Sequence, residues 1–495
     1  MSNDDKNIKL LIVGAGKAGE LLSADIAASN ELSFDVVGFV DDKPEKQGIE
    51  INGVKVYGTI ADLPRVVEET GATEILIAIP SQRGEIVRRV VQSANGKHLV
   101  FRILPRIAEV LAQDYEEDYL KFIRKVETGD LVGGEIPKAD QQILRDNMRE
   151  EVVLITGAAG SIGSELSRQV SLYQAKKVVF YDWWENGMFE LRNQILESYP
   201  DGDFEFVIGD IKDKTKINLI MRKYRPTSVF HAAAYKHVPL MESNAAEAVK
   251  NNIVGTKILA EASVRYKVKK FVLVSTDKAV NPTNVMGATK RAAEKVIHLT
   301  AETQSETKFC AVRFGNVANS NGSVIPFFER LLNKGGPLPV THPEITRFFM
   351  TIPEAVHLIL RAWTMGENND LFVLDMGESI KIHDLAKWMI ILNGYVPDED
   401  IKIVISGLRP GEKLYEEVLV QEEEVASTPV HNVFRTKNYL NFDRLAFLSN
   451  LSFLVDSLEE DQLDPKEVKK RLRGMISTYH PQGLDDEPAL GERAE

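Results

Sequence analysis

Two stretches of the chain join an apolar, strand-like run directly to closely spaced glycines. In IKLLIVGAG the run leads into Gly14, Gly16 and, further on, Gly19. In VVLITGAAGSIG it leads into three glycines at positions 157, 160 and 163. Strand, glycines and helix in this order are typical of a βαβ unit that binds a nucleotide, because glycines let the backbone at a helix N-terminus approach a pyrophosphate. The repetition predicts an α/β chain with two such domains.

The alternation of strand-like and helical segments indicates where these domains begin and end. Apolar runs such as KKVVFYD, FEFVIGD, TSVFHAAA, KKFVLVSTD and KFCAVRFGN follow the second glycine pattern at βα spacing, which predicts Rossmann-like doubly wound parallel sheets. We expect an N-terminal Rossmann-like nucleotide-binding domain over 1–125 and a helical connection over 126–150. A larger domain covers 151–480, with an irregular substrate cap after about residue 320. Residues 481–495 predict a flexible acidic tail.

Composition excludes several classes of function. The chain has 495 residues, too many for one ordinary core, and its net charge of −13 argues against nucleic acid as a partner. Apolar runs fall far short of the ~20 residues of a membrane span, so we expect no span in this chain. Cys310 is the single cysteine, which excludes a disulfide within the chain and fits a reducing, cytoplasmic location. His231 and His237 lack metal-ligand spacing, so we assign no metal.

The second glycine pattern carries the stronger cofactor prediction. The predicted contacts are Gly157, Gly160, Ser161, Ile162 and Gly163 in the pattern itself, together with Asp210, Ile211 and Ala232 after later strands. Asp182 ends the following strand, where a carboxylate binds a ribose diol and repels a 2′-phosphate, so NAD is favoured over NADP. Helix–sheet packing is the alternative reading of such glycines. In the first domain Asp41 is suitably placed but no catalytic set follows, so packing and nucleotide binding both stay open there.

The segment VLVSTDKA places candidate catalytic residues at the carboxyl end of a strand. Thr276, Asp277 and Lys278 lie where doubly wound sheets bind ligands. The next helix carries Met286 and Lys290 four positions apart and therefore on one face, the arrangement of a Tyr-Lys pair for hydride chemistry. Methionine cannot accept a proton. Core packing for the methionine and a surface ion pair for Asp277 and Lys278 are the alternatives.

Several motifs occur together in one order: TGAAGSIGSEL, HAAAYKHVPLME, NNIVGT, STDKAVNPTNVMGATKR, RFGNVANSNGSVIP, TRFFMT and GLRPGEKLYEE. With them the chain resembles the extended short-chain dehydrogenases/reductases, and closely the UDP-N-acetylglucosamine 4,6-dehydratases of bacterial polysaccharide and glycoprotein biosynthesis. Large members of that family carry membrane helices before an N-terminal Rossmann-like domain, so we expect a soluble variant or a truncated chain. Those members also have methionine in place of the tyrosine.

The resemblance implies a lyase that removes water from UDP-N-acetylglucosamine with a tightly bound, recycled NAD. C4 is oxidised, water leaves across C5 and C6, and a 4-keto-6-deoxy sugar results, with retention at C5 suggested by the large members. The implied roles are Asp277 as acid, Lys278 as base and Lys290 on the nicotinamide ribose. Our own hypothesis adds a hydrogen bond from Thr276 to the C4 hydroxyl. For the substrate the resemblance implies Lys236, Asn316, Arg347, Arg409 and, on the uridine ribose, Glu412. A homo-oligomer is expected.

Two other functions use the same motifs. A UDP-sugar 4-epimerase shares the cofactor and the C4 oxidation but normally relies on tyrosine, so Met286 argues against it. A catalytically silent NAD-binding sensor or scaffold would explain the missing tyrosine. The retained STDK and RPGEK motifs argue against that second alternative.

Overall fold

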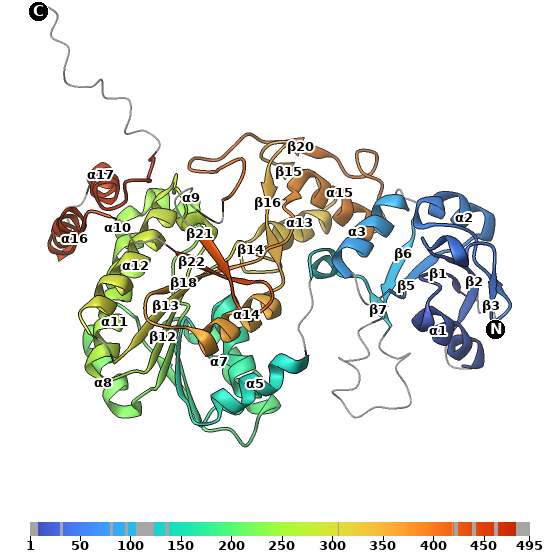
Figure 1. The fold of residues 1–495 in the computed structure, drawn as a ribbon. Coiled ribbons are helices and arrows are strands. Elements are labelled where there is room, and N and C mark those ends of the chain that lie inside the picture. The colour runs from blue at the N-terminus through green and yellow to red at the C-terminus, as the bar shows by residue number, and fades with distance from the viewer. Residues whose placement is uncertain are drawn as a thin grey trace, which may run out of the picture. The chain divides into compact units, whose positions relative to one another are not determined.

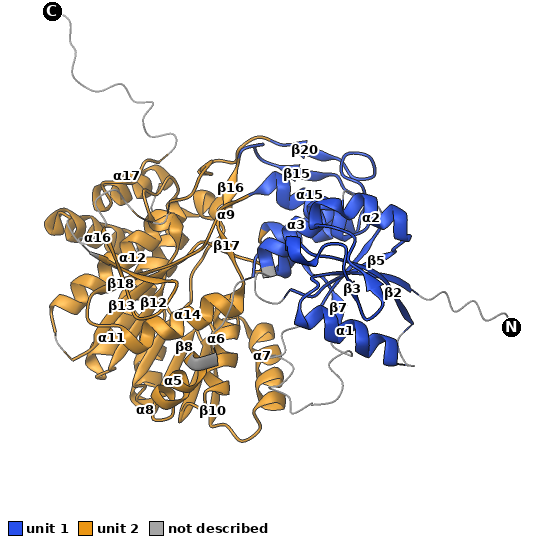
Figure 2. Ribbon diagram, turned by 45° about the vertical axis from the view of Figure 1, so that its right-hand side comes forward, with its two compact units in different colours: residues 1–134, 324–344, 381–406 blue, residues 135–323, 345–380, 407–495 orange. Residues whose placement is uncertain are grey.

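Contacts between residues divide the chain into two compact units (Figure 2). Unit 1 comprises residues 1–134, 324–344 and 381–406, and unit 2 comprises 135–323, 345–380 and 407–495. The computed structural model describes residues 8–29, 33–79, 83–94, 98–104, 123–133, 138–304, 306–417, 419, 424–437, 442–459 and 464–481. The predicted tail therefore lies, apart from residue 481, outside the described residues.

Unit 1 is built on a five-stranded sheet in the order β2-β1-β5-β6-β7, of which only β7 is antiparallel. Its strands and main helices are β1 (Ile8–Val13), α1 (Lys17–Ala28), β2 (Phe34–Val40), α2 (Leu63–Thr70), β5 (Glu74–Ile77), α3 (Arg83–Ser93), β6 (Val100–Ile103) and β7 (Arg124–Lys125). Branched apolar side chains such as Leu10 and Ile12 are fully buried in β1, which lies between β2 and β5. The parallel βα architecture predicted for this domain is confirmed.

Two later segments of the chain complete unit 1. They contain α13 (Val324–Leu332), β15 (Leu338–Val340), α15 (Ile382–Leu392) and β20 (Ile403–Ile405). β15 and β20 form a parallel pair, and α15 contacts α3. Thr128 Oγ1 donates a hydrogen bond to Glu329 Oε1 at 3.1 Å. Parts of the region that was expected to be an irregular cap therefore form regular helices and strands, because their apolar helices pack within unit 1.

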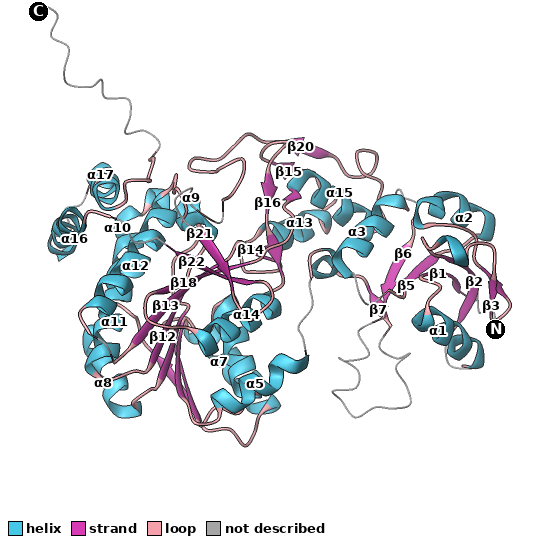
Figure 3. Ribbon diagram, in the orientation of Figure 1, coloured by secondary structure: helices cyan, strands magenta, loops and turns pink. Residues whose placement is uncertain are grey.

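Unit 2 contains a nine-stranded sheet in the order β10-β9-β8-β11-β12-β13-β18-β22-β21. Figure 3 shows strands of this sheet in magenta, with β12, β13, β18, β22 and β21 labelled. From β10 to β18 the neighbouring strands are parallel, and β22 and β21 add an antiparallel edge. The strands are β8 (Val152–Thr156), β9 (Lys177–Asp182), β10 (Phe204–Ile208), β11 (Ser228–His231), β12 (Lys270–Val274), β13 (Lys308–Arg313), β18 (Asp370–Leu374), β21 (Glu424–Ser427) and β22 (Val433–Lys437). Strand order reverses between β8 and β11, the switch point at which such sheets bind ligands. The predicted fold class is confirmed.

Helices cover both faces of this sheet (Figure 1). One layer is α5 (Lys138–Met148), α6 (Ser161–Leu172), α7 (Glu185–Ser198) and α14 (Ile352–Met365); the other is α8 (Lys214–Tyr224), α11 (Thr256–Arg265) and α12 (Val285–Glu302). In β8, Val153 and Ile155 join the core under the first layer, whereas Leu154 joins the core under the second. Side chains of a strand alternate between faces, so a strand buried on both sides reads as a continuous apolar run.

The last two described helices cover the outer side of α12. Helices α16 (Arg444–Glu459) and α17 (Pro465–Met475) share an apolar cluster with α12 that includes Phe447 and Leu472. Lys295 on α12 also donates from Nζ to the carbonyl of Met475 at 3.0 Å. Most of α12 is buried as a result. Among the described helices, none is long and apolar enough to cross a membrane.

Candidate active site

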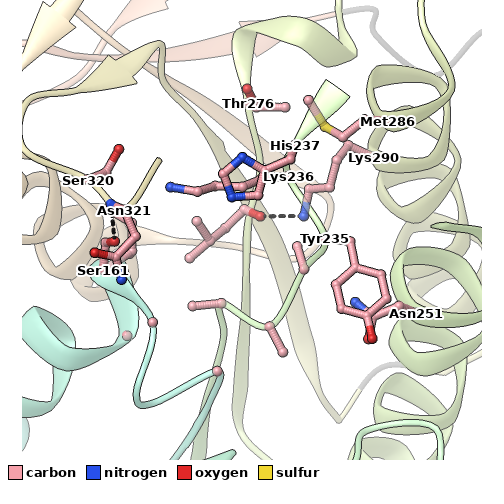
Figure 4. Close-up of a pocket in the computed structure, with 18 of the residues that line it drawn as sticks. Ser161, Tyr235, Lys236, His237, Asn251, Thr276, Met286, Lys290, Ser320 and Asn321 are labelled. Atoms are coloured by element: carbon pink, nitrogen blue, oxygen red, sulfur yellow. Dashed lines mark hydrogen bonds between the residues drawn. The ribbon is translucent and has the colours of Figure 1, made fainter. Parts of the chain in front are cut away.

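A cavity of about 810 Å³ lies in unit 2 at the carboxyl ends of β8, β11 and β12. Its wall comes from the glycine loop after β8, the ends of β9 and β11, the segment after β12, one face of α12 and the loop 314–323. Figure 4 shows Ser161 and Asn321 on one side of this cavity and Met286 and Lys290 on the other. Its size suits a small-molecule site, and it lies at the switch point of the sheet.

The glycine loop has a backbone that other residues could not adopt. Gly157 has a φ of +71°, and a Cβ at this position would lie 2.6 Å from the backbone nitrogen of Ala233. A Cβ on Gly163 would lie 1.8 Å from the carbonyl oxygen of Gly157. The loop therefore brings the start of α6 to the cavity, where its first backbone N–H groups have no partner within the helix and attract phosphate.

Asp182 is held at the end of β9 by two backbone donors. Its Oδ2 accepts a hydrogen bond from Ala159 N at 3.0 Å and its Oδ1 accepts one from Trp184 N at 2.9 Å. Gly160, Ser161, Ile162, Ile211 and Ala232 line the same cavity. Asp210 is not part of this wall, since its carboxylate faces Lys212 in its own loop. A helix N-terminus after a glycine loop and a carboxylate at the end of the next strand, both lining one cavity, fit NAD.

The candidate catalytic residues form a chain of short contacts after β12. Thr276 Oγ1 donates to Asp277 Oδ1 at 2.8 Å, and Lys278 Nζ donates to the same oxygen at 3.1 Å. Lys278 Nζ also donates to Asn316 Oδ1 at 3.1 Å. Thr276, Lys278 and Asn316 line the cavity, whereas Asp277 is 1% exposed and lies behind the wall. Any role of Asp277 is therefore exerted through its two neighbours in this conformation.

The electrostatic surroundings decide the resting charge of Lys278. Burial by itself would lower its pKa. The carboxylates of Asp277 and Glu416 outweigh burial and the nearby Arg347, and they raise the pKa of Lys278 above its ordinary value. The side chain is therefore an ammonium at rest, and the base role implied by the resemblance requires it first to lose a proton.

Met286 and Lys290 lie on the face of α12 that lines the cavity. The start of this helix approaches the catalytic segment closely, because a Cβ on Gly287 would lie 2.1 Å from the carbonyl oxygen of Lys278. Lys290 Nζ donates to the carbonyl of Val274 at 2.7 Å. Burial lowers the pKa of Lys290 to about 8, partly opposed by Glu294. The lowered pKa brings deprotonation of Lys290 closer to neutral pH, in a side chain that lines the cavity.

The predicted substrate contacts fall into two groups. Lys236 and Asn316 line the cavity, and burial lowers the pKa of Lys236. Arg347 is 8% exposed and donates to the carbonyls of Thr346 at 2.7 Å and Lys413 at 2.8 Å. Arg409, which is exposed, and Glu412 hydrogen-bond to each other within one loop.

Arg347, Arg409 and Glu412 are thus not part of the cavity wall. The guanidinium of Arg347 is largely used in holding the loop of the other two, to which it adds an ion pair with Glu412 at 3.5 Å. In this conformation these three residues, which the resemblance implied as substrate contacts, hold one another and the loop that carries Arg409 and Glu412. A direct contact of these three residues with a nucleotide stays a prediction.

Other wall residues were not predicted as site residues from the sequence. Tyr235, Asn251 and Asn321 line the cavity, as does His237, which was considered only as a metal ligand, and Asn321 N donates to Ser161 Oγ at 3.0 Å (Figure 4). Each of these residues belongs to one of the motifs named in the sequence analysis, so the sequence did contain a signal that could have identified them as site residues. Asn251 lies in a π-helical segment, Val249–Gly255, a feature often found at functional sites. The described residues contain no group of three His, Cys, Asp or Glu that could hold a metal.

The strand order, the glycine loop and the face of α12 define unit 2 as a Rossmann domain of the extended short-chain dehydrogenase/reductase class. The family described as "Polysaccharide biosynthesis protein" matches residues 153–438, and one described as "CoA-binding domain" matches residues 1–105. The chain belongs to the polysaccharide biosynthesis protein family.

The following named relatives match between 58% and 86% of the chain. "Capsular polysaccharide biosynthesis protein CapD" of Staphylococcus aureus is 44% identical over 86% of this chain and 71% of its own length. A Campylobacter jejuni "UDP-N-acetylglucosamine 4,6-dehydratase (inverting)" is 33% identical over 58% of the chain and 81% of its own. A Rickettsia canadensis "UDP-glucose 4-epimerase" is 35% identical over 58% and 82%. The solved structure of Pen from Bacillus thuringiensis covers 60% of the chain and 89% of its own, at 35% identity and a TM-score of 0.54.

Proposed function

We propose that the chain is a nucleotide-sugar enzyme that catalyses the NAD-dependent 4,6-dehydration of UDP-N-acetylglucosamine. The observation that carries the proposal is the convergence of Thr276, Lys278 and Asn316 on one cavity whose helical wall presents Met286 rather than a phenol. NAD, when bound, accepts a hydride from C4 of the sugar and returns it to C6. Its binding is assigned to the glycine loop and Asp182, with Lys290 at the nicotinamide ribose.

Thr276 supplies a proton path that does not need a tyrosine. Its hydroxyl lines the cavity and donates to Asp277 Oδ1 at 2.8 Å. When the C4 hydroxyl hydrogen-bonds to Thr276, the hydroxyl proton moves to Thr276 Oγ1 as the threonine proton moves to the Asp277 carboxylate. With this proton lost from its oxygen and the hydride lost from its carbon, C4 becomes a ketone, and Asp277 becomes a carboxylic acid.

This proton transfer also prepares Lys278 for the next step. Once Asp277 is neutral, the largest influence that holds Lys278 as an ammonium is gone, and burial and Arg347 favour the neutral amine. Lys278 releases a proton to solvent and then takes the C5 proton, which the ketone has made acidic. Asp277 returns its proton through Thr276 to the C6 hydroxyl, so the C6–O bond breaks and water leaves. After the hydride has returned to C6, Lys278 protonates C5 and then recovers a proton from solvent, so its ammonium is restored and the net change is the loss of one water.

We expect Thr276→Val to lower kcat about a hundredfold, since it removes the hydroxyl that relays both protons. Substrate affinity should change little, because the valine keeps the shape of the side chain. The measurement is steady-state formation of the 4-keto sugar beside wild-type protein and Thr303→Val, a matched change at the exposed end of α12. Activity of Thr276→Val within twofold of wild type would rule out the relay.

The reaction itself is tested by incubating the purified protein with UDP-N-acetylglucosamine in D₂O, without and then with added NAD. Loss of water with deuterium at C5, read by mass spectrometry and proton NMR, is the expected result, and the ring couplings show whether C5 is retained or inverted. A C4 epimer of unchanged mass would support the epimerase reading instead. Bound but unchanged sugar would support the sensor.

A further inference from the structure

A second carboxylate, on Glu416, faces the catalytic lysine from outside the STDK segment. Its Oε1 lies 3.6 Å from Lys278 Nζ and 3.7 Å from Arg347 Nε. The Glu416 side chain is only 5% exposed, and its Oε2 has no hydrogen-bond partner among the described residues. Burying a carboxylate with one oxygen unsatisfied is costly, so nearby charges must offset that cost.

The loop that carries Glu416 is docked onto the segment between β12 and α12. The carbonyl of Gly411 accepts hydrogen bonds from Thr283 Oγ1 at 3.0 Å and Asn284 Nδ2 at 3.2 Å. Lys413 Nζ donates to the carbonyl of Val280 at 3.0 Å, and Arg347 binds the carbonyl of Lys413. The position of Glu416 relative to Lys278 is therefore set by several contacts from both sides.

We propose that Glu416 is a positioning residue, held by Arg347, that keeps Lys278 protonated and directed at Asp277 and Asn316 until the C4 proton reaches Asp277. The inference rests on the proposed dehydration, in which Lys278 exchanges the C5 proton. Arg347 has the complementary role of neutralising Glu416, which explains why its guanidinium lies beside this carboxylate instead of in the cavity wall.

The charges around Lys278 support this division of roles. Asp277 and Glu416 are the two carboxylates that face its ammonium, and Arg347 is the cation that opposes them. Neutralising Asp277 during the reaction leaves one anion against one cation, a nearly balanced pair. Lys278 can then lose its proton, whereas at rest two anions prevent the loss.

The test is the reactivity of Lys278 with acetic anhydride as a function of pH, read by mass spectrometry in protein without substrate. Only a neutral amine is acetylated, and Lys278 is 19% exposed at the cavity. In Glu416→Gln we expect acetylation of Lys278 at pH 9, relative to exposed Lys267, to rise about tenfold, because the loss of one of two neighbouring anions lowers the pKa of the ammonium. The rise of kcat with pH should also move to lower pH.

Glu417→Gln is the matched control, because this neighbouring glutamate pairs only with Lys413 and Asn281 at the surface among the described residues. It should leave the acetylation profile unchanged, and Glu416→Asp should restore most of the wild-type profile. Equal acetylation of Lys278 in wild type and Glu416→Gln would overturn the proposal.

The wild-type profile keeps the proposal testable if Glu416→Gln does not fold. An acetylation midpoint for Lys278 below that of Lys267 would overturn it, since two carboxylates are expected to move the midpoint upward. A wild-type protein that shows the expected profile but removes no water from the sugar would contradict the proposed function and leave the role of Glu416 toward Lys278 intact.

Discussion

Replacing Lys278 with methionine is expected to lower kcat for the loss of water from UDP-N-acetylglucosamine by about 10²- to 10⁴-fold. Methionine keeps much of the length of the side chain but can neither take the C5 proton nor return it. The change also leaves the carboxylates of Asp277 and Glu416 without the ammonium that lies between them, at 3.1 Å from one and 3.6 Å from the other. The measurement is single-turnover formation of the 4-keto-6-deoxy product.

The control for this variant is Lys267→Met, which removes an ammonium from an exposed surface pair with Glu306. It should leave kcat unchanged within experimental error. Deuterium exchange at C5 should fall in parallel with product formation in Lys278→Met, because both need the same base. A variant that exchanges C5 at the wild-type rate but forms no product would show that another group takes the C5 proton.

The sheet of unit 2 could be read from the sequence because its strands are buried on both faces. Runs such as VVFYD and FVLV contain few polar residues. The glycines after β8 are required because Gly163 packs directly against Gly157. The strands and the glycine loop could therefore be predicted from residues that are close together in the chain. The assignment of 324–344 and 381–406 to unit 1 could not be read, since it depends on contacts such as α15 with α3 between segments far apart in the chain.

The site residues also divide into those that local sequence predicts and those whose position depends on distant segments of the chain. Thr276, Lys278, Met286 and Lys290 follow from strand-end position and helical spacing, and all four line the cavity. The orientation of Arg347 depends on carbonyls of a loop some sixty residues away in sequence, such as that of Lys413, and no local pattern reports it. Glu416 was overlooked for the same reason, although its motif was recognised.

The first domain repeats the cofactor geometry of the second with one difference. Asp41 Oδ2 accepts from Ala15 N at 2.8 Å, as Asp182 does from Ala159, and Gly14 has a positive φ of 108°. Lys46 Nζ, however, lies 3.3 Å from Asp41 Oδ2 and competes for the oxygen that would accept a ribose hydroxyl. Nucleotide binding by this domain stays a prediction, and a ligand there would have to displace or share Lys46.

Replacing Glu294 with alanine is expected to destabilise unit 2 by about 3 to 5 kcal/mol, the cost of removing one partner from a buried ion pair. Arg313 is fully buried and donates from Nε and Nη2 to the two carboxylate oxygens of Glu294, each at 2.8 Å. Ser275 Oγ donates to Glu294 Oε1 at 2.6 Å. The same carboxylate therefore compensates the guanidinium on β13 and holds the residue that precedes Thr276.

The measurement is urea unfolding followed by a signal from unit 2, with Glu302→Ala as the matched control. Glu302 lies at the end of the same helix, where its carboxylate lies 3.3 Å from His298 Nε2 and pairs with Arg444 at the surface, and surface pairs contribute less than about 1 kcal/mol. A loss below 1 kcal/mol in Glu294→Ala would show that Arg313 finds sufficient compensation elsewhere. Ser275 is next to Thr276 in the proton relay, so kcat at low urea should also fall in Glu294→Ala and stay unchanged in Glu302→Ala. This result would show that the buried ion pair positions the catalytic segment.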